Sequence, residues 1–264
     1  MILALLLLLA VSARAQDLAY DVEITGIEDG TLKDSVAEVS RLLSLKDRPP
    51  SSLAGLRRRA EEDRDRIQQV LRANGYYDGS VDALIDEEAE PAKVVLTILP
   101  GSVYPLAAYI IRTSPAEITV PLDVLGLEPG QPARSAEIVA ADAKLLAELA
   151  RRSYPLAHIR GRRALVDHTS RSVRVEVSVE TGPYARFGPA IITGLERVAE
   201  SIPRNRLPWR EGEPFDPRQL DKARRKLAET GLFAAIKLSP AEQAEADGRL
   251  PIRVELRERP HRSV

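Results

Sequence analysis

The stretch Lys226-Leu227-Ala228-Glu229-Thr230-Gly231-Leu232-Phe233 occurs in three versions along the chain. The other two are Val70-Leu71-Arg72-Ala73-Asn74-Gly75-Tyr76-Tyr77 and Glu148-Leu149-Ala150-Arg151-Arg152-Ser153-Tyr154-Pro155. Gly75, Ser153 and Gly231 lie 78 residues apart, and each follows a Leu by four positions. A fixed internal period indicates a repeated structural unit, which has to be explained before any single element is assigned.

Each version is typical of a helix that buries a Leu in its last turn, ends, and leads into a strand. Glycine supplies the left-handed backbone that is needed just past a helix end. Ser153 lacks that freedom, so we expect the second helix to end differently. The residues that define the repeat are Leu71, Gly75, Tyr76, Leu149, Tyr154, Leu227, Gly231 and Phe233.

The composition is that of a folded protein with mainly aliphatic cores. Hydrophobic residues make up 44% of the 264 residues, aromatic residues only 4%, and the formal net charge is −1. This charge balance argues against a nucleic-acid-binding surface. The chain has no cysteine, which excludes disulfides, a thiol nucleophile and a cysteine-ligated metal.

Residues 1–15 are predicted to be a signal peptide. Residues 2–11 are nearly all apolar, and Ala13-Arg14-Ala15 has the small-x-small pattern of a cleavage site. The apolar run is too short to span a bilayer comfortably. No basic residue precedes it, which leaves an uncleaved anchor or a different start codon as alternatives.

Between the helix ends, the hydrophobic pattern predicts the order β-α-α-β-β three times, an α+β fold. The clearest strand is 173–179, because four valines alternate there with polar residues. The other predicted strands cover residues 20–27, 76–85, 93–99, 103–112, 156–166, 185–192, 233–238 and 252–256. The predicted helices are 31–45, 53–74, a short helix or turn at 120–127, a long helix capped by Ser135, a short helix within 197–207 and a long helix capped by Asp216.

Two local sequence patterns add detail to the predicted helices. Pro217 fits the first position of the last long helix, and Gln219 is placed to complete a capping box with Asp216. In the first long helix, three arginines precede three acidic residues by four positions, which predicts ion pairs on its solvent face. The basic residues are Arg57, Arg58 and Arg59; the acidic ones are Glu61, Glu62 and Asp63.

The chain is therefore predicted to hold three tandem domains, each with two helices on one face of a three-stranded mixed sheet. Their predicted bounds are 17–100, 101–181 and 182–260, with 261–264 as a tail or the start of a further segment. The junctions are too short to be flexible tethers, so neighbouring domains are expected to touch. The second strand of each domain is predicted to be a free edge of its sheet.

These repeats resemble POTRA (polypeptide-transport-associated) domains. The resemblance rests on Leu-x-x-x-Gly-Tyr-Tyr at 71–77, Leu-x-x-x-Gly-Leu-Phe at 227–233, Glu-Gly-Glu-Pro-Phe at 211–215 and Gly-Pro-Tyr-Ala-Arg-Phe-Gly at 182–188. Three such domains behind a signal peptide resemble the periplasmic region of the TamA family of outer-membrane assembly factors, within the Omp85 superfamily. Arms of BamA-type or two-partner secretion proteins are the alternatives.

The resemblance implies a periplasmic arm tethered to the outer membrane through a β-barrel, which this sequence does not contain. It implies that the clients are unfolded outer-membrane or autotransporter polypeptides, and that a TamB-like partner docks at the first domain. If no barrel follows, a stand-alone periplasmic scaffold is the competing hypothesis.

No catalytic constellation is evident, so we do not expect an enzyme. His158 and His168 lie on or beside one predicted hairpin, but no third ligand follows at a fixed spacing. No phosphate-binding loop occurs. We therefore expect no metal and no cofactor, and a hydrolase with a site hidden between domains is the least favoured alternative.

The favoured mechanism is β-augmentation, in which an extended polypeptide pairs with an exposed sheet edge through its main chain. A proline at Val81 is expected to weaken such binding, because an edge strand would lose a donor. The candidate edge residues are Tyr77, Ser80, Val81, Ala83, Ile159, Arg160, Arg162, Phe233, Ile236 and Leu238.

Two further features allow two interpretations each. The basic cluster is either a contact for anionic lipid or an acidic partner, or a solvated face that protects a sheet edge; it comprises Arg151, Arg152, Arg160, Arg162 and Arg163. Trp209, the only tryptophan, either packs under the loop before the third long helix or anchors the arm to a barrel.

Overall fold

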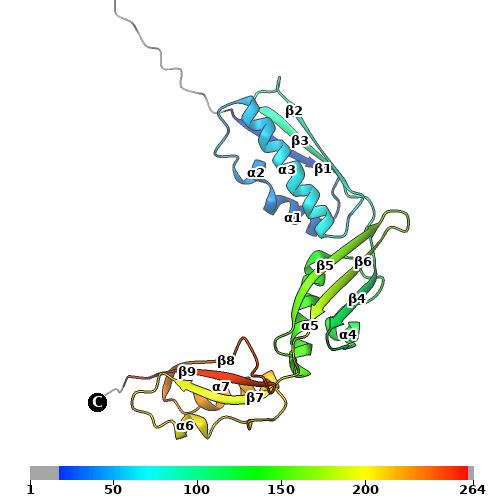
Figure 1. Ribbon diagram of the computed structural model, residues 1–264. Helices are drawn as coiled ribbons and strands as arrows, with labels where there is room; N and C mark the ends of the chain where they lie inside the picture. The colour runs from blue at the N-terminus through cyan, green and yellow to red at the C-terminus, as the bar shows by residue number, and fades with distance from the viewer. Residues whose placement is uncertain (1–17, 261–264) are drawn as a thin grey trace, which may run out of the picture. The chain divides into compact units, whose positions relative to one another are not determined.

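The computed structural model describes residues 18–260 (Figure 1). The predicted signal peptide and the 261–264 segment lie outside the described residues. The chain divides into two compact units. The first runs up to Tyr104 and includes Pro132–Ser135, and the second comprises Pro105–Gln131 and the chain from Ala136 onward.

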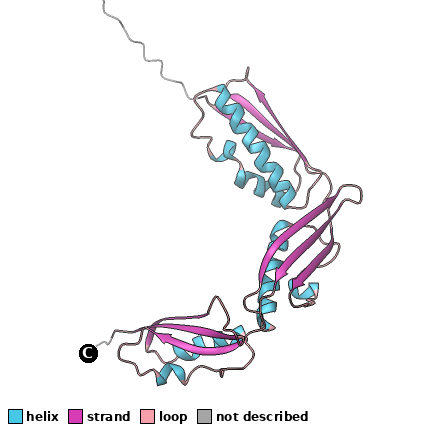
Figure 2. Cartoon of the chain, in the orientation of Figure 1, coloured by secondary structure: helices cyan, strands magenta, loops and turns pink. Residues whose placement is uncertain are grey.

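Three separate three-stranded sheets carry the fold, as predicted (Figure 2). Their strand orders are β1-β3-β2, β4-β6-β5 and β7-β9-β8. In each sheet the central strand pairs in parallel with the first strand and antiparallel with the second. The mixed α+β class is confirmed, and the last strand of each domain is the central one. The order β-α-α-β-β holds in the second and third domains, whereas the first has three helices between its first two strands.

The first domain packs its long helix against its sheet. Leu56, Ile67 and Leu71 of α3 are fully buried together with Val94 and Leu96 of β3. Buried and more exposed residues alternate along β3, so the helices cover one face of the sheet. The elements are β1 (Tyr20–Thr25), α1 (Gly30–Val39), α2 (Arg41–Ser44), α3 (Leu53–Ala73), β2 (Ser80–Asp86) and β3 (Ala92–Leu99).

The prediction of a single helix at 31–45 is wrong, because the helix is interrupted at Ser40. Ser40 has an extended backbone (φ −72°, ψ 118°), and its Oγ accepts a hydrogen bond from the Leu43 N–H at 3.2 Å. It thereby caps α2 at the point where α1 ends.

The prediction that Asp63 lies on the solvent face of the helix is wrong, because its side chain is completely buried. It accepts hydrogen bonds from the Ser40 hydroxyl at 2.7 Å and from the N–H groups of Arg41 and Leu42 at 3.0 and 2.8 Å. Arg66 pairs with it at 2.7 Å. Asp63 on α3 therefore satisfies backbone donors at the start of α2 that burial would otherwise leave unpaired.

The second domain repeats the arrangement with a shorter first helix. Leu145 and Leu149 of α5 and the valines of β6 are fully buried. Ser135 is the first helical residue of α5 and so does not precede the helix as the predicted cap. The elements are β4 (Leu106–Ser114), α4 (Leu122–Leu125), α5 (Ser135–Arg151), β5 (His158–Asp167) and β6 (Ser172–Glu180).

In the third domain, the predicted helix cap at Asp216 is confirmed, whereas the predicted capping box with Gln219 is wrong. Asp216 accepts a hydrogen bond from the Arg218 N–H at 2.9 Å, and Pro217 opens the helix. Gln219 does not complete a capping box, because no residue within the described chain hydrogen-bonds to its buried Oε1. The elements are β7 (Arg186–Thr193), α6 (Ser201–Arg204), α7 (Pro217–Ala228), β8 (Phe233–Pro240) and β9 (Arg249–Glu258).

Trp209 is buried in the core of this third domain. Its ring stacks on Phe187 with 4.9 Å between centroids, and Phe187 also contacts Phe215. The tryptophan thus packs under the loop before α7.

Ser153 does not end its helix differently from the two glycines. Its φ is +69°, in the same left-handed region as Gly75 at +93° and Gly231 at +68°. Its hydroxyl donates to the Phe215 carbonyl at 2.9 Å, and its own carbonyl accepts from the Ala185 N–H at 2.8 Å. These buried bonds offset the cost that a side chain pays in this conformation.

Candidate functional site

The strands β2, β5 and β8 each lie at an edge of their sheet and pair only with the central strand. Sequence reasoning overlooked the opposite edges, formed by β1, β4 and β7. The β-α-α-β-β order does not reveal them, because it does not say which strand is central.

The opposite edges are partly covered by the loops that precede the long helices. Leu106 of β4 exchanges backbone hydrogen bonds with Gln131 and Gly130 at 2.7 and 2.8 Å. Phe187 of β7 does the same with Glu213 and Gly212, at 2.8 Å each. The chain leading into β1 has a single such bond, from the Leu18 N–H to the Pro50 carbonyl at 2.8 Å.

The strand β2 differs from β5 and β8 in the regularity of its pairing with the central strand. All seven residues of β2 pair in continuous register with β3, from Ser80 opposite Leu99 to Asp86 opposite Lys93. The register of β5 shifts between Ile159 and Gly161, and β8 has a similar shift near its start. Such irregularities locally disrupt an edge and hinder a further strand from pairing there.

The candidate residues near β2 fall into two groups. Ser80 is exposed and Ala83 half-buried, while the Val81 side chain points into the core with 6% exposure. Tyr77 lies in a turn that precedes the strand, which corrects the predicted strand at 76–85. Its hydroxyl donates to the Ala133 carbonyl at 3.3 Å, so its role is structural within the first compact unit.

The candidates on β5 and β8 are less accessible or already engaged. Arg160 pairs with Glu180 at 3.1 Å, and Arg162 pairs with Asp142. Phe233 and Leu238 are buried in the third core, whereas Ile159 and Ile236 are half-buried. The structure therefore does not bring the candidate residues of the three domains to one site.

Comparison with known proteins identifies these domains. Residues 21–100 match the family described as POTRA domain TamA domain 1. The first domain is therefore similar to a POTRA domain of TamA, and the chain as a whole has the fold of tandem POTRA domains. The resemblance stated from the sequence is thus confirmed at this level.

One solved POTRA structure shares the fold of this chain. POTRA domains 3–5 of BamA from Haemophilus influenzae superpose with a TM-score of 0.55 at 17% identity, covering 92% of this chain and 96% of that one. BamA from Haemophilus ducreyi lacking POTRA domains 1–3 gives 0.48 at 20% identity, over 59% of this chain and 30% of that one. No curated protein matches the sequence.

In the first POTRA domain, contacts with α3 fix both ends of β2. Gln68 Nε2 of α3 donates to the Gly79 carbonyl at 2.8 Å, just before the strand. Arg57, also on α3, forms an ion pair with Glu87, just after the strand. The strand is therefore held against the helix, and among residues 18–260 no further strand pairs with its outer edge.

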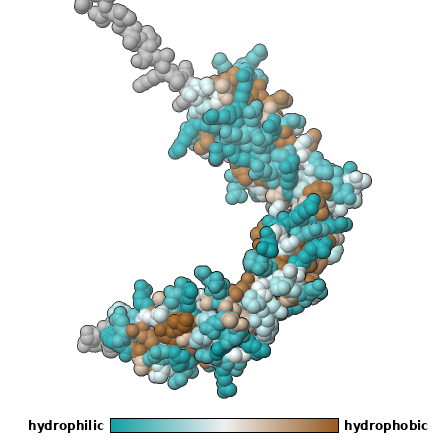
Figure 3. All heavy atoms as spheres, viewed as in Figure 1, coloured by the Kyte–Doolittle hydropathy of each residue, from teal (hydrophilic) through white to brown (hydrophobic). Residues whose placement is uncertain are grey.

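Two exposed apolar side chains lie on the solvent face of this sheet. Leu84 of β2 is 68% exposed, and Leu99 at the end of β3 is 58% exposed. Leu84 lies opposite Val95 of β3 and between Asp82 and Asp86 along β2. Figure 3 shows the side of the first domain that carries the helices, and hydrophilic residues predominate there. Leu84 thus offers an exposed apolar contact at a sheet edge.

Four of the five arginines in the basic cluster of the second domain form ion pairs with neighbouring carboxylates. Arg151 and Arg152 both pair with Glu148, at 3.4 and 2.8 Å. Asp142, which pairs with Arg162, also accepts the Tyr109 hydroxyl. Burial, and then this hydrogen bond, raise the pKa of Tyr109. These pairs favour the solvated-face interpretation over a free basic surface.

The described residues show neither a membrane span nor a metal cluster. Between residues 18 and 260, none of the helices combines the length and apolar character that crossing a bilayer requires. Over the same span, no three His, Cys, Asp or Glu side chains are grouped so that they could hold a metal ion.

Proposed function

We propose that this chain is the periplasmic arm of a TamA-like outer-membrane assembly factor, and that it binds extended polypeptide by β-augmentation at β2. The observation that carries the proposal is the continuous seven-residue register of β2 at an open sheet edge. The match of residues 21–100 to the first POTRA domain of TamA supports the TamA-like assignment.

An incoming strand would pair with the unpaired N–H and C=O groups of β2, which requires little of its sequence. Side chains on alternate positions would meet Leu84 on the solvent face, with Asp82 and Asp86 on either side of it along the strand. A cross-strand apolar partner for Leu84, flanked by basic or polar residues, is therefore the preferred pattern. Unfolded outer-membrane or autotransporter polypeptides are the clients we propose, with a TamB-like protein as the partner at the first domain.

Edges elsewhere in the chain are secondary sites in this proposal. The register shifts of β5 and β8 interrupt pairing, and loops already bond to the starts of β4 and β7. The proposal therefore assigns strand capture to the first domain.

A scaffold that holds folded partners is the second candidate. It is favoured by the buried Ser153–Phe215 hydrogen bond and the Ala185–Ser153 backbone bond, which tie the second and third domains together in one compact unit. An arm of a BamA-type protein is a further alternative, supported by the likeness to BamA POTRA domains 3–5.

The test is a proline scan of β2 at Ala83 and Leu84. Consecutive residues of an edge strand direct their N–H groups alternately toward β3 and toward the open side, so one of the two substitutions removes only an open-side donor. Val81 is unsuitable, because a proline there would also remove a buried core side chain. The folded variant should bind an extended client peptide about tenfold more weakly, the effect of losing a main-chain bond at a fixed edge.

Ala164→Pro on the β5 edge is the matched control and should leave client affinity unchanged. Circular dichroism identifies which β2 variant keeps its fold. Undiminished client binding by a folded β2 variant would exclude this edge, and capture of folded partners without peptide binding would favour the scaffold.

A further inference from the structure

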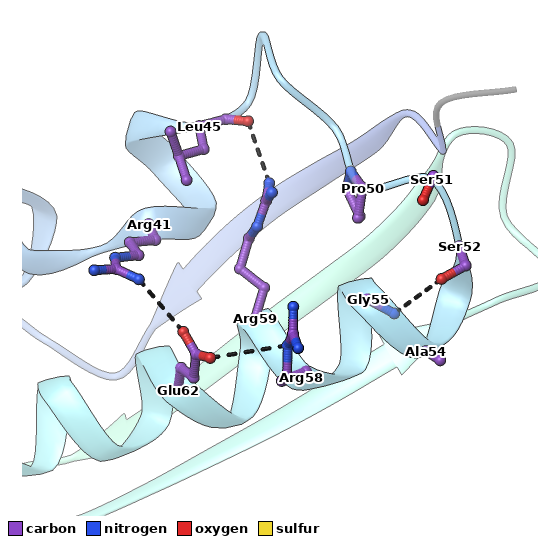
Figure 4. Close-up of a pocket in the computed structure, with 10 residues that line it drawn as sticks. All are labelled: Arg41, Leu45, Pro50, Ser51, Ser52, Ala54, Gly55, Arg58, Arg59 and Glu62. Atoms are coloured by element: carbon purple, nitrogen blue, oxygen red, sulfur yellow. Dashed lines mark hydrogen bonds and ion pairs between the residues drawn. The ribbon is translucent and has the colours of Figure 1, made fainter. Parts of the chain in front are cut away.

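A cavity of about 720 Å³ lies beside α2 and the first turns of α3 (Figure 4). It is separate from the pairing edge of β2, and nothing in the proposed strand capture uses it. Arg41 of α2 lines it together with Arg58, Arg59 and Glu62 of α3, and the loop 50–52 closes one side.

The lining has more positive than negative charge. Three guanidinium groups share the cavity with the single carboxylate of Glu62. Figure 4 shows Glu62 between Arg41 and Arg58, at 3.6 and 3.9 Å. Arg66, outside the cavity, holds the same carboxylate more closely at 2.9 Å, and this bond is the main cause of the lowered pKa of Glu62. The ion pairs of Arg41 and Arg58 are therefore long ones.

Arg59 differs from the other two because the fold fixes it. Its Nη1 donates to the Tyr20 hydroxyl at 2.9 Å and to the carbonyls of Leu45 and Arg48 at 3.3 and 3.2 Å. Arg41 and Arg58 are less constrained, since their side chains are 58% and 81% exposed and each forms a long ion pair with Glu62. The cavity thus combines one fixed cation with two that can adjust to a ligand.

We propose that this cavity binds a phosphate group, either as inorganic phosphate or as a phosphate monoester such as a lipid headgroup. Its three arginines and one glutamate leave two uncompensated positive charges, which a phosphate dianion balances. Guanidinium groups from two helices approach from different directions, which suits a tetrahedral anion with several acceptor oxygens better than a single planar carboxylate. The positive end of the 21-residue α3 adds to the same field.

The deciding experiment titrates inorganic phosphate into the full chain at constant ionic strength, followed by calorimetry. We expect saturable binding, and a rise of about tenfold or more in the dissociation constant for the Arg41→Gln/Arg58→Gln double variant, because each loses charge-assisted hydrogen bonds. Arg224→Gln is the matched control, since Arg224 is an exposed arginine on α7 paired with Asp221. It should leave phosphate binding unchanged.

Absence of saturable binding, or equal weakening in the Arg224→Gln control, would overturn the proposal. So would tighter binding of a glutamate-rich peptide than of phosphate, which would assign the cavity to carboxylates. Sedimentation with phosphatidic acid vesicles, against phosphatidylcholine vesicles, separates the two sources. Vesicle binding lost in the double variant supports a lipid headgroup, whereas phosphate binding without vesicle binding supports a soluble phosphate. Because β2 is unaltered, client binding reports separately on the proposed function.

Discussion

The long helices α3 and α5 occupy equivalent places in the first two domains but differ at two aligned positions. Leu71 and Leu149 are both fully buried in the last turn. Two turns earlier, α3 buries the carboxylate of Asp63 where α5 buries the methyl group of Ala141. The difference follows from the neighbouring helix, because α2 presents two backbone N–H groups to Asp63, whereas α4 has no side-chain cap.

The second difference is at the helix end. Gly75 and Ser153 share a left-handed backbone, and each carbonyl accepts a hydrogen bond at 2.8 Å, from the N–H of Tyr104 and of Ala185 respectively. Only Ser153 adds a side-chain bond, to Phe215. The comparison teaches that a repeat keeps its apolar positions, while its polar exceptions are set by the particular element packed beside them.

The largest effect is expected at Asp63. Asp63→Ala makes α3 resemble α5 but leaves the Ser40 hydroxyl, two backbone N–H groups and Arg66 without their buried partner. The first domain should lose about 3–5 kcal/mol of unfolding free energy. Hydrogen exchange of α2 and α3, followed by mass spectrometry, measures this domain by itself.

Asp65→Ala is the matched control, because the Asp65 side chain is 69% exposed on the same helix. Its effect should stay within about 0.5 kcal/mol. A loss below about 1 kcal/mol for Asp63→Ala would contradict the capping role of Asp63.

A smaller effect is expected at Ser153. Ser153→Ala keeps the strained backbone but leaves the Phe215 carbonyl unpaired, and should cost about 1–2 kcal/mol. Ser153→Gly should cost less, because glycine relieves the strain. Urea unfolding monitored by the fluorescence of Trp209, which packs in the same aromatic cluster as Phe215, reports the change. Equal stability of the serine and alanine proteins would show that the hydroxyl bond contributes nothing.

The smallest effect is expected at Glu258, near the end of the central strand β9, where the central strand β3 of the first domain ends on the apolar Leu99. The Glu258 carboxylate accepts hydrogen bonds from the N–H groups of Val198, Arg197 and Glu196, which lower its pKa below the ordinary 4.5. A lowered pKa contributes stability above pH 4.5 that is lost as the pH falls toward the folded-state pKa.

The third domain should therefore lose stability in acid, with Glu258 contributing to the loss, and Glu258→Gln should reduce this dependence on pH. Fluorescence of Trp209 between pH 6 and pH 2, chosen to bracket the titration of a carboxyl group, measures the transition. Superimposable pH profiles of the two proteins would contradict this assignment.

The fold could be predicted because its signals are local. The alternating valines of β6 and the Leu-x-x-x-Gly helix ends each depend on a few adjacent residues. Asp63 was misassigned because its spacing to Arg59 matched a surface ion pair, whereas its partner Ser40 lies 23 positions away. Tyr76 and Tyr77 resembled the start of a strand, but a turn at Tyr77 and Asp78 delays the strand to Ser80.

The candidate site was only partly predictable for the same reason. The sequence analysis predicted the second strand of each domain as a sheet edge, but the β-α-α-β-β order alone does not say which strand is central. Whether an edge can accept another strand depends on its pairing register and on the loops beside it. The shifts in β5 and β8, and the loops that cover β4 and β7, involve partners distant in sequence. No local sequence pattern predicts these register shifts or loop contacts.

The loops that are hydrogen-bonded to β4 and β7 would compete, from within the chain, with any external polypeptide that pairs with these strands. Gln131 and Glu213 already supply, from within the chain, the kind of main-chain pairing that an incoming polypeptide would make. An edge of this kind is closed at no cost in association entropy, because its occupant is covalently attached. The accessibility of the β4 and β7 edges is thus governed by the length and reach of one loop each, and altering that loop would open the edge while every strand stays the same.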